Sequence, residues 1–320
     1  MHAHYFGGVV DRWFRTFGHT MTGGYRLGGW TVEGALAFMA RHDIATQILS
    51  FPRALGTGSR APDGPVAFAR RLNEEYAALV ADHPGRFGAF AAVPLTTPDA
   101  ALAEIEYALD VLRLDGVLLT SNTDGRYFGD SSLEPVLAEL AWRGTPVFVH
   151  PEDAPHIERL GLGRPSSVVE FPLDTTRNIT NAIYQGVFRR HPGLRLILAH
   201  CGGALPTLGW RIAEHTEMGR GVDDADIGPP HVAEVLRALY YETALAAGPH
   251  SLLPALQVTS HRHVLFGTDF PAAREVTIAR ALANWESSGA LDDGERAAVE
   301  RSNALELFPR LALQRHSGGL

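Results

Sequence analysis

Short apolar runs alternate with longer segments of helical period along the whole of this 320-residue chain. Runs such as Gly116–Thr120 (GVLLT) and Pro146–His150 (PVFVH) are rich in β-branched residues, as buried strands are. Segments such as Pro65–Asp82 lie between them, and their large apolar residues recur every three or four positions. This alternation is typical of βαβ units and a parallel sheet.

With a clipped strand at the very start, the pattern contains eight strand–helix units. Further strands are expected at Ala45–Phe51, Phe87–Leu95, Arg195–His200, Tyr240–Leu245 and His263–Thr268. Further helices are expected at Thr31–Arg41, Pro98–Arg113, Ser132–Arg143, Asp174–Arg190, Leu205–His215, His231–Leu239, His250–Thr259, Val276–Glu286 and Asp293–Leu307.

No linker, charge block or low-complexity tract divides the chain. We therefore expect one domain over residues 1–320, folded as a single (β/α)8 TIM barrel with C-terminal helices. The alternative is an open doubly wound sheet, but no Gly-rich nucleotide turn follows an early strand. The two longest irregular stretches, Arg53–Gly64 and Pro151–Val168, each follow a strand, which is where barrel active sites are built.

The composition excludes several classes of function. A hydrophobic content of 45% can build a large core, and the net charge of −8 argues against nucleic acid or an anionic membrane as partner. Cys201 is the only cysteine, which excludes an intrachain disulfide or a thiolate zinc cluster. No apolar run is long enough to span a membrane, and the N-terminus lacks signal-peptide features, so a cytoplasmic location is expected.

Four histidines and one aspartate lie at the ends of predicted strands. His2 and His4 alternate and so point to the same side of the first strand, while His150, His200 and Asp269 each end a later one. In a barrel these ends converge at the C-terminal mouth. Imidazoles with one carboxylate suit Zn²⁺ or Mn²⁺, so the pattern predicts a metal site.

Each residue alone has a simpler interpretation. A single histidine at a strand end is more often a core or loop residue, and an aspartate in GTD usually caps a turn. Independent placement would scatter the histidines, however, and most of the others are scattered among turns, helix ends and the opposite rim. These are His42, His83, His191, His215 and His263. His156, in the loop after His150, is the one further candidate for the mouth.

The motifs HAH, VFVHP, LILAHCGG and FGTDFP resemble those of the amidohydrolase-related, metal-dependent decarboxylases, which act on aminocarboxymuconate semialdehyde, γ-resorcylate or 6-methylsalicylate. The resemblance is greatest to the 6-methylsalicylate branch, through ILSFPRAL, GVLLTSNTDGRYFGD and DTTRNITNAIYQGVFRRHPGLRLILAHCGG. It extends from His2 to about Phe308. The family carries several residues before the HxH pair, one of them acidic, so a short first strand is expected here.

The resemblance implies a set of roles. His2, His4, His150 and Asp269 become ligands of one divalent ion per subunit, Zn²⁺ or alternatively Mn²⁺. His200 becomes the acid/base or hydrogen-bonding histidine beside it. The resemblance also suggests a homodimer.

The expected reaction is non-oxidative decarboxylation of an ortho-hydroxy aromatic acid similar to salicylate or 6-methylsalicylate. Asp269 would protonate the ring carbon, with His200 holding a substrate oxygen or relaying the proton. A metal-dependent hydrolase of an amide or lactone is the alternative, because the same residues serve both reactions. No predicted strand ends in a lysine that could bridge two metals, which favours a single ion. A non-catalytic metal-binding protein is a third hypothesis.

Several polar residues are candidates for the substrate pocket. Arg53 follows the second strand and could meet a substrate carboxylate, while Arg211 lies eleven residues after His200, where related decarboxylases often carry an arginine at the pocket or dimer contact. Each is equally compatible with a surface position. Ser121 and Asn122 follow a strand and could hydrogen-bond a ring substituent, or simply form a turn.

Aromatic residues could form walls for a planar ring. Phe51, Trp210 and Phe270 are the candidates, although apolar residues at such positions more often belong to the core. Asp174, near Glu170, is interpreted as a helix N-cap, with support of the site as the less favoured interpretation.

Overall fold

The computed structural model describes residues 1–17, 29–61, 63–218, 221–222 and 226–313. Within them, eight parallel strands follow one another in sequence order around a single sheet. The strands are β1 (Ala3–His4), β2 (Gln47–Ser50), β3 (Phe87–Ala92), β4 (Gly116–Thr120), β5 (Pro146–His150), β6 (Arg195–Leu198), β7 (Tyr240–Glu242) and β8 (Val264–Leu265).

The segment after β8 returns to β1 and closes the ring. Ala3 and Phe270 form a parallel bridge, and the amide of His4 donates to the Phe270 carbonyl at 2.7 Å. The amide of Asp269 donates to the His2 carbonyl at 3.0 Å. These bonds join the first and last strands, which confirms the closed barrel and excludes the open doubly wound sheet.

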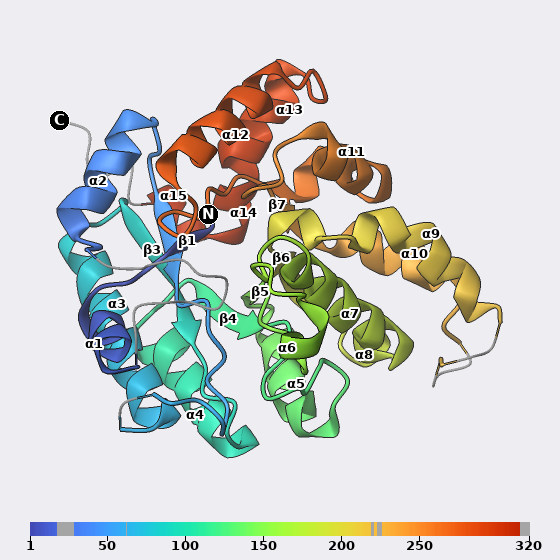
Figure 1. Ribbon diagram of the computed structural model, residues 1–320, viewed down its shortest axis with the longest axis horizontal. Coiled ribbons are helices and arrows are strands. Elements are labelled where there is room, and N and C mark those ends of the chain that lie inside the picture. Colours follow the sequence, from blue (N-terminus) through green and yellow to red (C-terminus); the bar gives the residue numbers. More distant parts are fainter. Residues whose placement is uncertain (18–28, 62, 219–220, 223–225, 314–320) are drawn as a thin grey trace.

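Helices surround the strands on the outside (Figure 1). They are α1 (Gly8–Phe17), α2 (Val32–Arg41), α3 (Pro65–Asp82), α4 (Pro98–Glu106), α5 (Glu134–Arg143), α6 (Ile157–Leu160), α7 (Glu170–Tyr184), α8 (Val187–Arg190), α9 (Leu205–Thr216), α10 (Pro229–Ala238), α11 (Pro249–Val258), α12 (Glu275–Ser287), α13 (Asp293–Ala297), α14 (Asn303–Leu307) and α15 (Pro309–Leu313). None of these helices is both long and apolar enough to cross a lipid bilayer.

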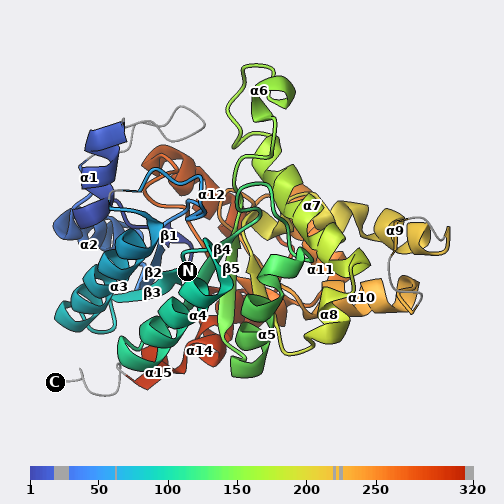
Figure 2. The same cartoon turned by 90° about the horizontal axis from the view of Figure 1, so that it is seen from below.

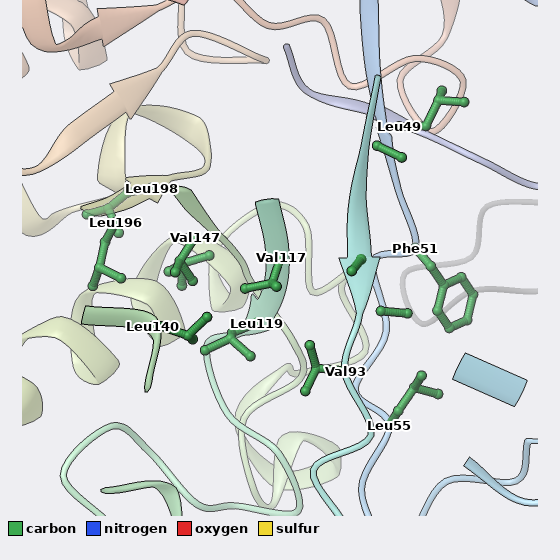
Figure 3. Packing of buried hydrophobic residues seen from close by; sticks show 14 of the residues in the cluster. Leu49, Phe51, Leu55, Val93, Val117, Leu119, Leu140, Val147, Leu196 and Leu198 are labelled. Atoms are coloured by element: carbon green, nitrogen blue, oxygen red, sulfur yellow. The ribbon is translucent and has the colours of Figure 1, made fainter. Parts of the chain in front are cut away.

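The two faces of the sheet support separate cores, as the alternation of side chains along a strand requires. Outward-facing residues such as Val117, Leu119 and Val147 pack against the helices (Figure 3). A second cluster contains the alternate strand residues, including Phe90 and Phe148, whose rings stack 5.2 Å apart. Because the barrel interior is filled at this level, a substrate site is confined to the ends.

The C-terminal helices close one end of the barrel. Leu307, Phe308 and Leu311, from α14, α15 and their junction, belong to the interior cluster, and Phe308 contacts the ring of Phe90. In Figure 2, α14 and α15 lie on the side opposite to the protruding loop that carries α6. The open end is therefore the one to which the carboxyl ends of the strands lead.

The sequence did not indicate α1. Its first turn is capped from a distant element, because the amide of Val9 donates to both carboxylate oxygens of Glu75 on α3, at 3.0 and 3.1 Å. A cap supplied by a residue so far along the chain leaves no local signal. β1 is only two residues long, as the HxH resemblance led us to expect.

Candidate metal centre and active site

The predicted ligands meet at the mouth of the barrel. The Nε2 atoms of His2 and His4 are 3.0 Å apart, and the Asp269 Oδ1 lies 2.9 Å from His4 Nε2 and 3.3 Å from His2 Nε2. His150 completes the group, its ring centroid 5.3 Å from that of His2 and 5.0 Å from that of His4. All four residues are buried, and one ligand atom of each lies within 4.8 Å of the others.

The outer nitrogens of the three histidines have acceptors that fix their tautomers. His2 Nδ1 donates to Glu242 at 2.8 Å, and His150 Nδ1 donates to the Pro151 carbonyl at 2.8 Å. His4 Nδ1 is 3.1 Å from the hydroxyl of Ser50, whose own proton is directed to the Ala3 carbonyl. Each Nδ1 therefore carries a proton, and each Nε2 presents its lone pair to the centre, as metal-binding histidines do.

This arrangement fits a divalent ion. Two unprotonated Nε2 atoms at 3.0 Å, with a carboxylate oxygen beside them, repel one another unless a positive charge lies between them. Ligands that share an ion at about 2.0–2.2 Å are about 3 Å apart. Three imidazole nitrogens and one carboxylate oxygen are also the donors that zinc and manganese accept.

Electrostatics support the same interpretation. Burial lowers the pKa of His2, but the carboxylates of Glu242 and Asp269 more than offset this and raise it above the ordinary value. Burial and the neighbouring imidazoles hold the pKa of His150 well below its usual range. Burial alone would raise the pKa of Asp269, but His2 and His4 bring it down to about 2. The centre thus contains an ionised carboxylate that attracts one cation.

Glu242, at the end of β7, is a functional residue that the sequence reasoning missed. Its Oε1 accepts hydrogen bonds from His2 Nδ1 at 2.8 Å and from the amide of His200 at 2.6 Å, and its Oε2 accepts from the amide of Ala244 at 2.9 Å. A Cβ atom on Gly267, just after β8, would lie 2.1 Å from this carboxylate. Only glycine therefore fits at that position beside Glu242. The signal available in the sequence was the single acidic residue, Glu242, within the predicted strand Tyr240–Leu245.

His200 lies beside the ligand group without belonging to it. It follows β6 in the left-handed region, with φ of 56°, and Cys201 follows with φ of 52°. His200 Nδ1 donates to the Ala244 carbonyl at 2.8 Å, and its ring centroid is 5.2 Å from that of His2. This strained turn leaves Nε2 as the ring nitrogen available for a ligand, as expected at an active site.

A cavity of about 270 Å³ leads to these residues. Loops after four strands line it together with the histidines and Asp269. Its lining residues are His4, His150, Ser167, Val168, Phe171, Pro172, His200, Gly203, Leu245, Ala246, Ser251, Asp269 and Ala272. The centre is therefore accessible from the mouth and can serve as a catalytic site.

The amidohydrolase family model matches residues 1–310, nearly the whole chain. This chain belongs to the amidohydrolase family. It is 32% identical to the 6-methylsalicylic acid decarboxylase of Penicillium expansum over 316 residues, which cover 97% of this chain and 96% of the relative.

Solved structures agree with the family assignment. The crystal structure of an amidohydrolase II superposes with a TM-score of 0.86 and 24% identity, over 96% of this chain and 98% of that one. A 2,6-dihydroxybenzoate decarboxylase, solved with 2,6-dihydroxybenzoate, gives a TM-score of 0.76 and 26% identity over 89% of each chain.

The amidohydrolase does not bring the predicted aromatic walls to this cavity. Phe51 is buried among core rings, 4.8 Å from Trp13, and Phe270 stacks on Phe38 at 3.9 Å. Trp210 is 77% exposed on α9. Aromatic residues in these segments satisfy packing between barrel and helices, or remain at the surface, and none of the three lines the cavity.

The predicted polar contacts also lie outside it. Arg53 pairs with Glu152 at 3.2 Å and lines a small neighbouring hollow with Phe51. Arg211 is exposed on α9, and His156 is exposed in the loop before α6. None of these three residues lines the cavity: Arg53 and His156 lie in loops, and Arg211 lies on a helix.

Asp174 is not the helix N-cap that the sequence suggested. Helix α7 begins at Glu170, one turn earlier, and Asp174 is buried inside it. Its carboxylate accepts hydrogen bonds from Ser121, from Asn122 at 2.8 Å, and from Tyr127 and Arg177 at 2.6 Å each. Ser121 also accepts from the amide of Glu152 at 2.9 Å, so this network fastens the loops that follow β4 and β5, next to His150.

Proposed function

We propose that this amidohydrolase is a metal-dependent, non-oxidative decarboxylase of an ortho-hydroxy aromatic carboxylic acid of the salicylate or 6-methylsalicylate type. The observation that carries the proposal is the group of three Nε2 lone pairs and one carboxylate at the base of a cavity, with His200 beside it. The similarity over nearly the full length to a 6-methylsalicylic acid decarboxylase supports the reaction.

His2, His4, His150 and Asp269 would hold one Zn²⁺ or Mn²⁺ ion. When bound, such an ion would supply Lewis-acid stabilisation of negative charge on the substrate oxygens. The sequence contains no lysine that could bridge a second ion, which supports a single-metal site.

The protein's own residues would supply the proton that is added to the substrate ring. Its addition to the ring carbon bearing the carboxylate interrupts aromaticity, the C–C bond then breaks with its electron pair returning to the ring, and CO₂ leaves. Asp269 is ionised in the free protein, so it takes this proton from the substrate hydroxyl or from water and delivers it to carbon. His200 Nε2 holds the substrate oxygen or relays the proton, since Nδ1 is bonded to Ala244.

Three finer assignments belong to the same proposal: one catalytic domain, a homodimer and a cytoplasmic location. Two exposed apolar side chains, Trp210 on α9 and Met218 just after its end, offer a surface for a second copy near Arg211. The single cysteine, Cys201, is buried and unpaired in the described residues, which suits a reducing compartment.

The test is incubation with 6-methylsalicylate, salicylate and a simple aryl lactone, with and without added Zn²⁺ or Mn²⁺. Metal-dependent CO₂ release from the acids supports the proposal. Lactone opening without loss of CO₂ would overturn it in favour of a hydrolase. An Asp269→Asn protein that binds metal and keeps full turnover would remove Asp269 from its role as proton donor.

A further inference from the structure

We infer that the cavity admits aromatic acids with a single anionic group and rejects those with a second ring carboxylate, and that Leu245 is a main determinant of this selectivity. The inference rests on the proposed function, because it takes the first carboxylate to lie at the metal centre. It concerns the part of the ring that faces away from that centre.

The charge of the cavity wall is the first argument. Among the described residues that line it, the ionisable ones are His4, His150, His200 and Asp269, all at its base. No arginine lines the described wall, and the sequence has no lysine. A second carboxylate would therefore lose its hydration without gaining a cationic partner, which is unfavourable.

Two arginines near the mouth, Arg53 and Arg177, are paired with carboxylates. Arg53 pairs with Glu152 at 3.2 Å, and Arg177 pairs with the buried Asp174 at 2.6 Å. Moving either one into the cavity would leave a buried or largely buried carboxylate without its cation. Neither of these two arginines can therefore supply a positive charge to the ring without breaking an existing ion pair.

Apolar groups from two loops form the rest of the wall. Val168, Phe171 and Pro172 come from the segment before α7 and from its first turn, and Leu245 and Ala246 come from the loop after β7. These surfaces suit an aromatic ring with an alkyl substituent. Ser167 and Ser251 are the neutral polar members, so a ring hydroxyl can also find a partner.

Leu245 is placed at the wall by an unusual backbone. Its φ is 52°, in the left-handed region that bulky residues rarely adopt, and the residue is 45% exposed. The amide of Ala246 donates to the Thr243 carbonyl at 2.9 Å and fixes this turn. An apolar side chain in a strained turn at the rim is therefore in position to contact the substrate, and a longer cationic one could reach the ring from the same Cα.

The test compares salicylate with 4-hydroxyisophthalate, which keeps the ortho-hydroxy acid and adds a second carboxylate. For the Mn²⁺-loaded protein we expect kcat/KM to be at least about 100-fold higher for the first acid. Leu245→Arg should reduce that ratio at least about tenfold by improving use of the diacid. Leu253→Arg, on the exposed part of α11 outside the cavity wall, is the matched control and should leave the ratio unchanged.

A second variant and a binding measurement complete the test. Ser251→Arg places the same charge on the cavity from α11, so it replaces Leu245→Arg if that variant does not fold. If no acid releases CO₂, the proposed reaction fails, but the Kd values of the two acids for the metal-loaded protein still measure the charge preference. Equal kcat/KM or equal Kd for the two acids, or the same ratio in Leu245→Arg and Leu253→Arg, would overturn the inference.

Discussion

Glu242 accepts a hydrogen bond from Nδ1 of His2 at 2.8 Å, so a buried carboxylate on β7 orients a candidate metal ligand that lies just before β1. The same oxygen accepts a hydrogen bond from the backbone amide of His200 at 2.6 Å. One side chain therefore positions both the metal ligand and the histidine beside it. Because Glu242 is fully buried, water screens its charge only weakly from His2 and His200.

Glu242→Gln should weaken metal binding about 10- to 100-fold, because the amide removes the charge that sets the tautomer and basicity of His2. Titration of the metal-free protein with Mn²⁺ or Zn²⁺ measures the change. Glu234→Gln, on the exposed face of α10, is the control and should bind as the parent protein does. Equal affinity in the two variants would contradict the role given to Glu242.

Complete removal of divalent ions by a chelator should abolish CO₂ release, and stoichiometric Zn²⁺ or Mn²⁺ should restore it. The reason is that His2, His4, His150 and Asp269 are gathered closely enough to hold one ion, and three of them line the cavity. Metal content is measured by atomic emission alongside activity. Turnover that persists after complete demetallation would contradict the site as assigned.

His200→Gln should lower kcat by about 10²- to 10⁴-fold while the protein keeps its metal, because His200 borders the cavity but is not one of the four ligands. His156→Gln, in the exposed loop before α6, is the matched control and should keep the parental kcat. Loss of metal from the His200 variant would instead make this residue a ligand.

The sequence predicted those parts of the protein that local pattern determines. Strands β4 and β5 begin and end at the predicted residues, and helix α3 does as well. The grouping of the four candidate ligands could be predicted because parallel strands in a barrel bring their carboxyl ends together whatever lies between them. No knowledge of loop conformation was needed for that step.

Features that depend on distant contacts could not be predicted in this way. The cap of α1 comes from Glu75, and Asp174 became a network centre because α7 starts one turn before the expected N-cap. The positions of the aromatic candidates Trp210 and Phe270 depend on how their helix and loop pack in three dimensions. The local sequence pattern does not determine this packing. The cavity wall depends on the same loops, so Leu245 gave no signal in the sequence.

Phe308→Ala should destabilise the protein by about 3–5 kcal/mol, the usual cost of removing a fully buried phenylalanine. Its ring closes the barrel end opposite the cavity, 5.7 Å from Phe90, and a void there would open beneath the stacked Phe90–Phe148 pair. Urea unfolding measures the change, with Leu253→Ala on the exposed surface of α11 as a control that should shift stability by less than about 0.5 kcal/mol. Because Phe148 also contacts His2, at 4.8 Å between ring centroids, the void lies two rings away from the metal centre. Metal affinity of the folded variant should therefore stay within a few fold of the parent, and a loss as large as that expected for Glu242→Gln would show that the barrel core and the centre are more tightly coupled than these contacts indicate.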